Sequence, residues 1–245
     1  MSRQKPNCHQ CKNADTCLKN CLDYSASQQF QEVISRPPLF ARGEYLFNAG
    51  DPVQALYIIR SGSIKLSQLT EGGNERVLGF YLPGVLLGVD GLADGVHSCD
   101  AMVLETTSVC RIPLNDLMHL CATYPALNKS FYSRIGKEVQ KSHTLCAVLD
   151  KKNAEQRIAY LLLSLSEHFK HRGMSPTAFF LSMPRHDIAS YLGLADETVS
   201  RAFKRLQEDE IINVEHRLIH ILEPDALAHL ASETTSVSHL SLIAA

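Results

Sequence analysis

The sequence predicts an α+β protein with an amino-terminal, jelly-roll-like β-roll, a long helix and a carboxy-terminal winged helix-turn-helix. Three regions of different residue pattern support this order. Residues 37–113 carry short runs of β-branched and aromatic residues separated by glycines, and residues 125–150 follow a helical pattern interrupted only by Gly136. Residues 184–222 hold two short helical patterns and then an alternating stretch. Repeated short strands with glycine turns are typical of barrels and jelly rolls.

Length and composition are those of a globular protein. The chain has 245 residues, of which 45% are hydrophobic and 20% charged, and its formal net charge is −2. This length suits two ordinary domains or one large one. The start, MSRQKPNCHQ, lacks the apolar core of a secretory signal, and no apolar run approaches the roughly eighteen residues of a membrane span. We therefore expect a cytoplasmic protein with no membrane contact.

The amino-terminal segment concentrates thiols. Residues 1–24 show little apolar periodicity and could not form a core alone, so we expect something to tie them down. Four cysteines fall within "CHQCKNADTCLKNC", which runs from Cys8 to Cys21. In a cytosolic chain, clustered cysteines are more often metal ligands than disulfides.

Four further cysteines are scattered: Cys99, Cys110, Cys121 and Cys146. A scattered cysteine is most often a small buried apolar residue.

The next elements follow from local patterns. Phe30, Val33 and Ile34 have helical spacing. In "LYIIRSGSIKL" the apolar residues nearly alternate around Ser61-Gly62, which predicts two strands joined as a hairpin by a tight turn.

The long helix carries a stripe with the alternating three- and four-residue period of a coiled-coil seam. Its members are Tyr132, Ile135, Val139, Ser142, Cys146 and Leu149. The stripe predicts self-association. The alternative is that it packs against its own domain, although a second apolar set (Phe131, Leu145 and Val148) could face the barrel instead.

The stretch "MPRHDIASYLGLADETVSRAFKRLQED" divides at Gly193 into two helical faces. A small residue at Ala189, a glycine at the turn and Val199 beyond it predict a helix-turn-helix, whose crossed helices need a small residue at their contact. "INVEHRLIHIL" alternates like a hairpin and predicts the wing.

Glu197, Ser200 and Arg201 share the face of the second helix opposite its apolar stripe. In a major groove, arginine can bind guanine and glutamate can accept from cytosine, each discriminating by ~1–3 kcal/mol. A solvated face with an internal ion pair is the alternative. Residues 184–222 hold five basic and seven acidic side chains. One such helix-turn-helix should therefore attract DNA phosphates only weakly, so we expect two of them to bind DNA together.

This order of elements resembles the cyclic-AMP receptor protein/FNR (fumarate and nitrate reduction regulator) superfamily of bacterial transcription regulators. The resemblance covers residues 8–230, including "GEYLFNAGD", "LYIIRSGSIK", "DKKNAEQRI" and "ETVSR". It implies a non-enzymatic homodimer that reads palindromic half-sites one helical turn apart.

Two motifs assign the branch. Cyclic-nucleotide binders have a glycine-glutamate pair and a downstream arginine, but this chain has Leu87-Gly88-Val89 and, further on, His97-Ser98. We therefore expect no cyclic nucleotide. The FNR branch has C-x2-C-x5-C and a fourth cysteine in "LETxxVC".

The cysteine spacing matches the FNR branch. Cys8, Cys11 and Cys17 have the spacing C-x2-C-x5-C, and Cys110 lies in "LETTSVCRIP". The resemblance implies that these four thiolates hold a [4Fe–4S] cluster whose loss in oxygen releases the segment. Cys21 departs from the pattern and is most simply a spare thiol; the alternatives are a substitute ligand or a place where a degrading cluster lodges.

The resemblance also implies partners. Glu197, Ser200 and Arg201 should read a TTGAT–ATCAA-type palindrome, and the loop around Gly73 and Asn74 should touch RNA polymerase, unless it is an ordinary hairpin turn.

Two positions depart from the family pattern. Ser142 stands where FNR proteins commonly carry an aspartate that keeps the cluster-free form apart, which predicts more residual dimer in air. Asp196 stands where a neutral residue is usual. We expect it to cap the second helix. The alternative is that its charge repels a phosphate or alters the preference for the outer base pair.

The resulting domain assignment is a cysteine-rich cluster-binding segment (1–24), a β-roll sensor domain (25–124), a dimerisation helix (125–150), a winged helix-turn-helix DNA-binding domain (151–232) and a flexible tail (233–245).

Three rival classes stay open. They are an iron-sulfur enzyme or electron carrier, a regulator with structural zinc on Cys8, Cys11, Cys17 and Cys21, and a heme or thiol sensor using Cys99 or His97. No catalytic motif stands out in the sequence.

Overall fold

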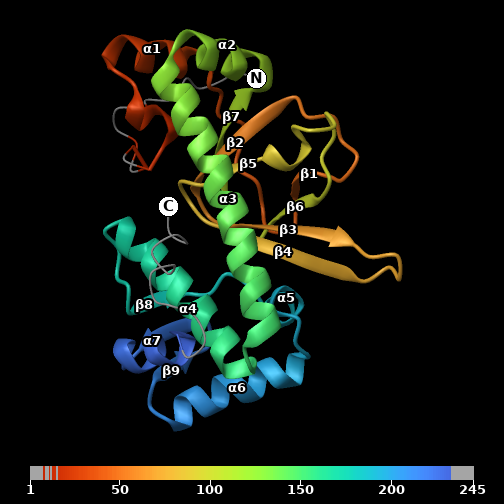
Figure 1. Ribbon diagram of the computed structural model, residues 1–245, viewed down its shortest axis with the longest axis vertical. Coiled ribbons are helices and arrows are strands. Elements are labelled where there is room, and N and C mark those ends of the chain that lie inside the picture. The colour runs from red at the N-terminus through yellow and green to blue at the C-terminus, as the bar shows by residue number, and fades with distance from the viewer. Residues whose placement is uncertain (1–7, 9–10, 12, 15, 233–245) are drawn as a thin grey trace. The chain divides into compact units, whose positions relative to one another are not determined.

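The computed structural model describes residues 8, 11, 13–14 and 16–232 (Figure 1). The predicted flexible tail, 233–245, lies outside the described residues, as does part of the predicted cluster-binding segment. The chain forms two compact units, residues 1–136 and 137–245, whose positions relative to one another are not determined. Each unit is therefore described by itself.

The first unit contains the predicted β-roll. One antiparallel sheet has the order β1-β6-β3-β4 and the other the order β5-β2-β7. The strands are β1 (Tyr45–Phe47), β2 (Ala55–Ser61), β3 (Ile64–Leu69), β4 (Glu75–Tyr81), β5 (Leu86–Leu87), β6 (Asp100–Val103) and β7 (Ser108–Pro113). The helical elements are η1 (Leu18–Cys21), α1 (Tyr24–Val33), η2 (Val89–Gly91), α2 (Leu114–Thr123) and the first part of α3 (Pro125–Lys151).

The two strands predicted around Ser61-Gly62 are present, but they do not pair with each other. Strand β2 pairs with β5 and β7, whereas β3 pairs with β4 and β6. Ile59 and Ile64 both enter the core between the sheets, so the turn carries the chain from one sheet to the other. Gly62 has φ +84°, and a Cβ there would lie 2.2 Å from Thr107 Oγ1. The hairpin prediction was wrong because a turn of this kind can also connect two layers.

A second core lies on the other face of the β5-β2-β7 sheet. Leu56 and Ile58 of β2 join it, whereas the intervening Tyr57 packs against the core between the sheets, as strand alternation requires. Helices α1, α2 and α3 contribute Phe30, Leu117, Leu120, Leu127 and Phe131. The same core includes Cys8 and Cys110, which places the cysteine site against this sheet.

Helix α3 confirms the helix predicted at 125–150 and has 27 residues (Figure 1). Phe131, a member of the second apolar set, is buried in the second core, which lies on the other face of the β5-β2-β7 sheet. Tyr132 and Val139 of the stripe are 63% and 48% exposed. The helix therefore uses one face for the roll and leaves much of its predicted seam uncovered.

The second unit confirms the winged helix-turn-helix. Its elements after α3 are α4 (Ala154–His171), β8 (Ala178–Phe180), α5 (Arg185–Leu192), α6 (Asp196–Glu208), β9 (Ile212–Glu215), β10 (Leu218–Ile221) and α7 (Pro224–Ser232). Helix α5 ends at Gly193, which has φ +62°. The stripe Val199, Ala202, Phe203 and Leu206 of α6 is buried.

The predicted wing is the antiparallel pair β9 and β10, and β8 adds a third strand in the order β8-β10-β9. Strand β8, which has three residues, was not predicted from the sequence. None of the helices in the described part of the chain is long and apolar enough to cross a membrane.

Candidate functional site

The cysteine site joins the amino-terminal segment to strand β7. Cys110 lies on β7 opposite Ile58 of β2. Cys8 and Cys110 are buried in one hydrophobic cluster, and Cys17 packs against it. Residues about a hundred positions apart are thus brought together by pairing of β7 with β2 and by folding of the segment over the sheet.

Contacts within the protein hold the segment on the roll. Asn13 donates from Nδ2 to the carbonyl oxygens of Ile59 and Arg60, at 3.3 and 2.9 Å. The backbone N–H of Cys8 donates to Gln31 Oε1 at 3.0 Å, and Leu18 is fully buried. These contacts tie the described part of the segment to the roll, in agreement with the expectation from the sequence that something would.

Burial raises the pKa values of the thiols that meet here. It raises the pKa of Cys110 to about 12; the Arg60 guanidinium opposes this, whereas the Cys17 and Cys8 thiols add to it. Burial, followed by the Cys17 thiol, raises the pKa of Cys8. Burial also raises the pKa of Cys17, and Cys11 adds to the pKa of both Cys8 and Cys17. The thiols of Cys8, Cys17 and Cys110 thus hold their protons more tightly than a free thiol, and binding of an electrophilic group would release them.

Guanidinium groups surround these thiols. Arg36 opposes the raised pKa of Cys8 and Cys110, and Arg134 opposes that of Cys17. The Nε atoms of Arg36, Arg60 and Arg134 are buried and have no hydrogen-bond partner. Buried donors without acceptors are costly in a native protein. An anionic sulfur-ligated group would supply both acceptors and compensating charge, so this donor set fits an iron-sulfur cluster.

Cys21 differs from the other three amino-terminal cysteines. Its side chain is exposed and donates from Sγ to the carbonyl oxygen of Leu18 at 3.1 Å. It also contributes to the raised pKa of Cys121 in α2, which is chiefly due to burial. Cys99 and Cys121 are buried, as expected of scattered cysteines, but Cys146 is exposed on α3, contrary to that expectation.

The predicted reading face lies on α6. Glu197, Ser200 and Arg201 are exposed, on the side opposite the buried stripe. Ser200 donates from Oγ to the carbonyl oxygen of Asp196 at 3.0 Å, and Arg201 donates from Nη2 to Thr198 Oγ1 at 3.5 Å. The face is available to a partner.

Asp196 does not cap α6. The N-cap is Ala195, which makes no side-chain hydrogen bond, and Asp196 is the first helical residue. Its Oδ2 lies 3.5 Å from Nδ1 of His186 on α5. The capping prediction was therefore wrong, because the helix begins one residue earlier than a capping aspartate requires.

The predicted seam of α3 is uneven in burial. Val139, Ser142 and Cys146 are exposed, whereas Ile135 and Leu149 are partly buried. Ser142 donates from Oγ to the carbonyl oxygen of Glu138 at 3.0 Å.

The loop predicted to meet RNA polymerase connects β3 to β4. Its backbone closes by bonds from Gly73 N to Thr70 O and from Thr70 N to Asn74 O, at 2.8 and 2.9 Å. Gly73 and Asn74 are exposed at its tip.

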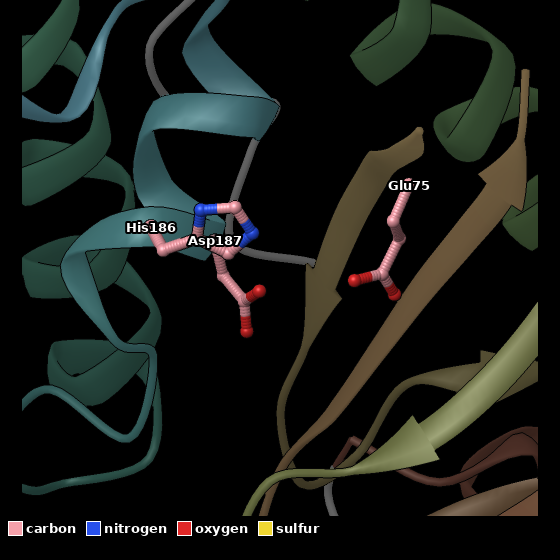
Figure 2. A group of neighbouring side chains, drawn as sticks. All are labelled: Glu75, His186 and Asp187. Atoms are coloured by element: carbon pink, nitrogen blue, oxygen red, sulfur yellow. The ribbon is translucent and has the colours of Figure 1, made fainter. Parts of the chain in front are cut away.

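Figure 2 shows His186 and Asp187 near the start of α5, and Glu75 on β4. Glu75 belongs to the first unit and the other two residues belong to the second. Because the relative positions of the units are not determined, we assign no metal site to these residues.

Comparison with known proteins follows the same division of the chain. Residues 38–124 match the cyclic nucleotide-binding domain family, and residues 156–230 match the Crp-like helix-turn-helix domain family. The chain is 38% identical over 230 residues to the transcriptional activator protein Anr of Pseudomonas protegens, covering 94% of each. It is 38% identical over 231 residues to the fumarate and nitrate reduction regulatory protein of Escherichia coli K12, covering 94% of this chain and 92% of that one. The chain belongs to the FNR branch of the Crp/FNR superfamily.

A solved structure of the superfamily has the same architecture. FixK2 of Bradyrhizobium japonicum matches with a TM-score of 0.74 and 25% identity, over 83% of this chain and all of that one. The FNR-type relatives are transcription regulators and not enzymes, which identifies this chain as a regulator with a helix-turn-helix and excludes the iron-sulfur enzyme.

Sequence reasoning missed the residues that support the cysteines, namely Asn13, Arg36, Arg60 and Arg134. Arg60 directly follows the apolar run "LYII". A charged residue at the end of a predicted buried strand was the signal that could have pointed to Arg60.

Proposed function

We propose that this FNR-branch regulator holds a [4Fe–4S] cluster on Cys8, Cys11, Cys17 and Cys110 and binds palindromic DNA as a homodimer when oxygen is scarce. The observation that carries the proposal is the burial of Cys110 with Cys8 and Cys17 among guanidinium groups whose Nε atoms lack partners. When bound, the cluster would supply four bonds to thiolates and a chemical sensitivity to oxygen. Everything else in the switch is done by the chain itself.

The segment is the element that responds. Asn13 and Leu18 keep it close to the roll, so losing thiolate bonds would loosen it rather than release it fully. Local opening of such a segment is a two-state change that a ligand can bias.

The partner of α3 is a second copy of the chain, through Ile135, Val139, Ser142, Cys146 and Leu149. The exposure of Val139 and Tyr132 supports this choice, because apolar side chains at coiled-coil spacing gain from mutual burial.

Each protomer reads a half-site of the TTGAT–ATCAA type through Glu197, Ser200 and Arg201, and contacts RNA polymerase near Gly73 and Asn74. The reading face is exposed and its helix is held by a buried stripe, which fixes the orientation of these side chains. The excess of acidic side chains around it favours paired binding over single-head binding.

The roll acts without a cyclic nucleotide although it matches that domain family. Asp90 accepts from Ser98 N at 2.9 Å and lies 3.4 Å from His97 Nδ1. The His97 ring stacks on Phe47 with 3.6 Å between ring centroids. The polar groups of this region therefore bond to one another.

The test is quantification of iron and sulfide in anaerobically purified protein, with sedimentation and operator binding before and after exposure to air. We expect four irons and four sulfides per protomer, and weaker dimerisation and DNA binding in air. Equal sedimentation and equal operator affinity in the two states would contradict the proposal.

A regulator with structural zinc is the second candidate, favoured only by the thiol-rich sequence. It requires Cys21, whose side chain is exposed and bonded to Leu18 O, and it has no place for Cys110. Colourless protein that retains zinc in air would support it.

Ser142 should weaken the switch, because no carboxylates repel across the seam. Ser142→Asp should lower the residual dimer fraction in air while leaving the cluster-bearing dimer in place. Sedimentation at matched protein concentrations measures both, and an unchanged aerobic dimer would contradict this role.

A further inference from the structure

Arg134 connects the cysteine segment to helix α3. It lies next to the seam residue Ile135, and its guanidinium donates from Nη2 to the carbonyl oxygen of Thr16 at 2.6 Å. Thr16 is the residue directly before Cys17. The second nitrogen, Nη1, donates to the carbonyl oxygen of Gly84 at 3.4 Å. One side chain of α3 thus binds both the segment and the roll.

The surroundings of this contact are tight. Gly84 is buried with φ +98°, and a Cβ there would lie 2.7 Å from Thr16 Oγ1. Thr16 itself donates from Oγ1 to the carbonyl oxygen of Asn13 at 3.3 Å, which links the contact to the Asn13 anchor. The carbonyl of Thr16 therefore cannot move far without disturbing Arg134.

The guanidinium depends on these acceptors. Burial lowers the pKa of Arg134, and the thiols of Cys17 and Cys21 oppose that change. The Nε atom is buried and has no hydrogen-bond partner, and the hydrogen bonds that the guanidinium does make go to the carbonyl oxygens of Thr16 and Gly84. Removing an acceptor from a partly buried charged donor is costly.

We propose that Arg134 is a positioning residue that transmits the state of the Cys17 segment to the dimerisation face of α3. This rests on the proposed cluster and dimer, and it assigns the coupling between them to one side chain. With the segment in place, the two carbonyl oxygens hold Arg134 and keep α3 at a defined rotation on the roll. When the segment shifts, the guanidinium of Arg134 loses the carbonyl oxygen of Thr16 as its acceptor and turns toward water instead. The adjacent Ile135 moves with Arg134.

The alternative is that Arg134 only helps to retain the segment. The two roles differ in a measurable way. A retention residue alters the amount of iron bound, whereas a transmitting residue alters how strongly dimerisation depends on iron.

The experiment compares wild type with Arg134→Met, which keeps length and removes the donors, and with Lys129→Met as the control. Lys129 is exposed on the same helix and loses the same charge in the substitution. Iron and sulfide content and the dimerisation constant are measured anaerobically, and the constant is measured again after removal of the cluster. Circular dichroism verifies the fold.

When fully cluster-loaded protein is compared with cluster-free protein, we expect the ratio of the two dimerisation constants to fall by about tenfold or more in Arg134→Met. Lys129→Met should keep the wild-type ratio. Arg134→Lys, which can reach one carbonyl but not both, should lie between the two.

An unchanged ratio in Arg134→Met would overturn the proposal, and so would equal iron loss in Arg134→Met and Arg134→Lys, which would mark a retention role. Should Arg134→Met fail to fold, a wild-type ratio in Arg134→Lys would overturn it equally. Failure of the proposed function would be seen separately, in the wild-type protein. That protein would then bind no iron, or its dimerisation constant would be the same with and without iron.

Discussion

The two units satisfy their polar and apolar groups in different ways. In the second unit, α6 buries its apolar stripe and exposes Glu197, Ser200 and Arg201 on the opposite face. In the first unit, the thiols of the segment are buried at a raised pKa, and the Nε atoms of three arginines near them have no acceptor. The helix-turn-helix therefore buries its apolar stripe without any partner, whereas the proposed cluster site keeps donors that a bound ligand would satisfy.

The largest effect is expected from a substitution that removes the proposed ligand on the sheet and so breaks the connection to the amino-terminal segment. Cys110→Ser should abolish most iron binding, because a serine hydroxyl is a poor replacement for a thiolate in this buried site. Cys21→Ser is the matched control and should keep the full iron content. Iron and sulfide analysis of anaerobic protein measures both, and iron retained by Cys110→Ser would remove the basis of the proposed site.

The second prediction concerns a substitution that should destabilise the helix-turn-helix and leave the proposed cluster site intact. Phe203 is buried in α6, and the Arg185 guanidinium lies 3.3 Å from its ring centroid. Phe203→Ala should destabilise the second unit by about 3–5 kcal/mol. Operator binding should fall while iron content stays at the wild-type level. Phe180→Ala removes a 71% exposed ring and is the control; loss of iron in Phe203→Ala would contradict the independence of the two units.

The third prediction touches only the outer face of α6. Arg201→Ala should cost ~1–3 kcal/mol of operator binding and relax discrimination at one base pair. Because Arg201 is exposed and bonds only weakly to Thr198, the fold and the iron content should not change. Electrophoretic competition between the palindrome and single-base variants measures the effect. A uniform loss over all sequences would assign Arg201 to phosphate contact instead.

The smallest expected effect concerns a buried tyrosine of the second unit. Burial raises the pKa of Tyr160 to about 12 from 10.0, so the folded state holds the phenol proton more tightly than the unfolded state. Its stabilising contribution is complete below pH 10 and is lost as pH rises through about 12. The pH dependence of unfolding should thus be shallower for Tyr160→Phe than for wild type.

Tyr24→Phe, at a 69% exposed position, is the control. Urea unfolding followed by circular dichroism suits this chain, which has no tryptophan. Equal slopes for Tyr160→Phe and wild type would contradict the role given to burial.

Local patterns were sufficient for much of the fold. The stripe of α6, the glycine after α5 and the uninterrupted stretch 125–150 each depend on residues within a few turns of one another, so periodicity predicted them correctly. The spacing of Cys8, Cys11 and Cys17 and the "LETTSVC" context of Cys110 singled out these four cysteines by resemblance. Whether those four hold a cluster stays a prediction.

The sequence alone determined the order of the elements, the helical and strand periods and the chemistry of the candidate ligands, because each is written in neighbouring residues. Only the tertiary structure decided that β2 and β3 belong to different sheets and that Asp196 pairs with His186 instead of capping. It also decided that Arg134 binds Thr16, 118 positions away. Such contacts arise when distant segments pack on a common core, and no local period records which surfaces will meet.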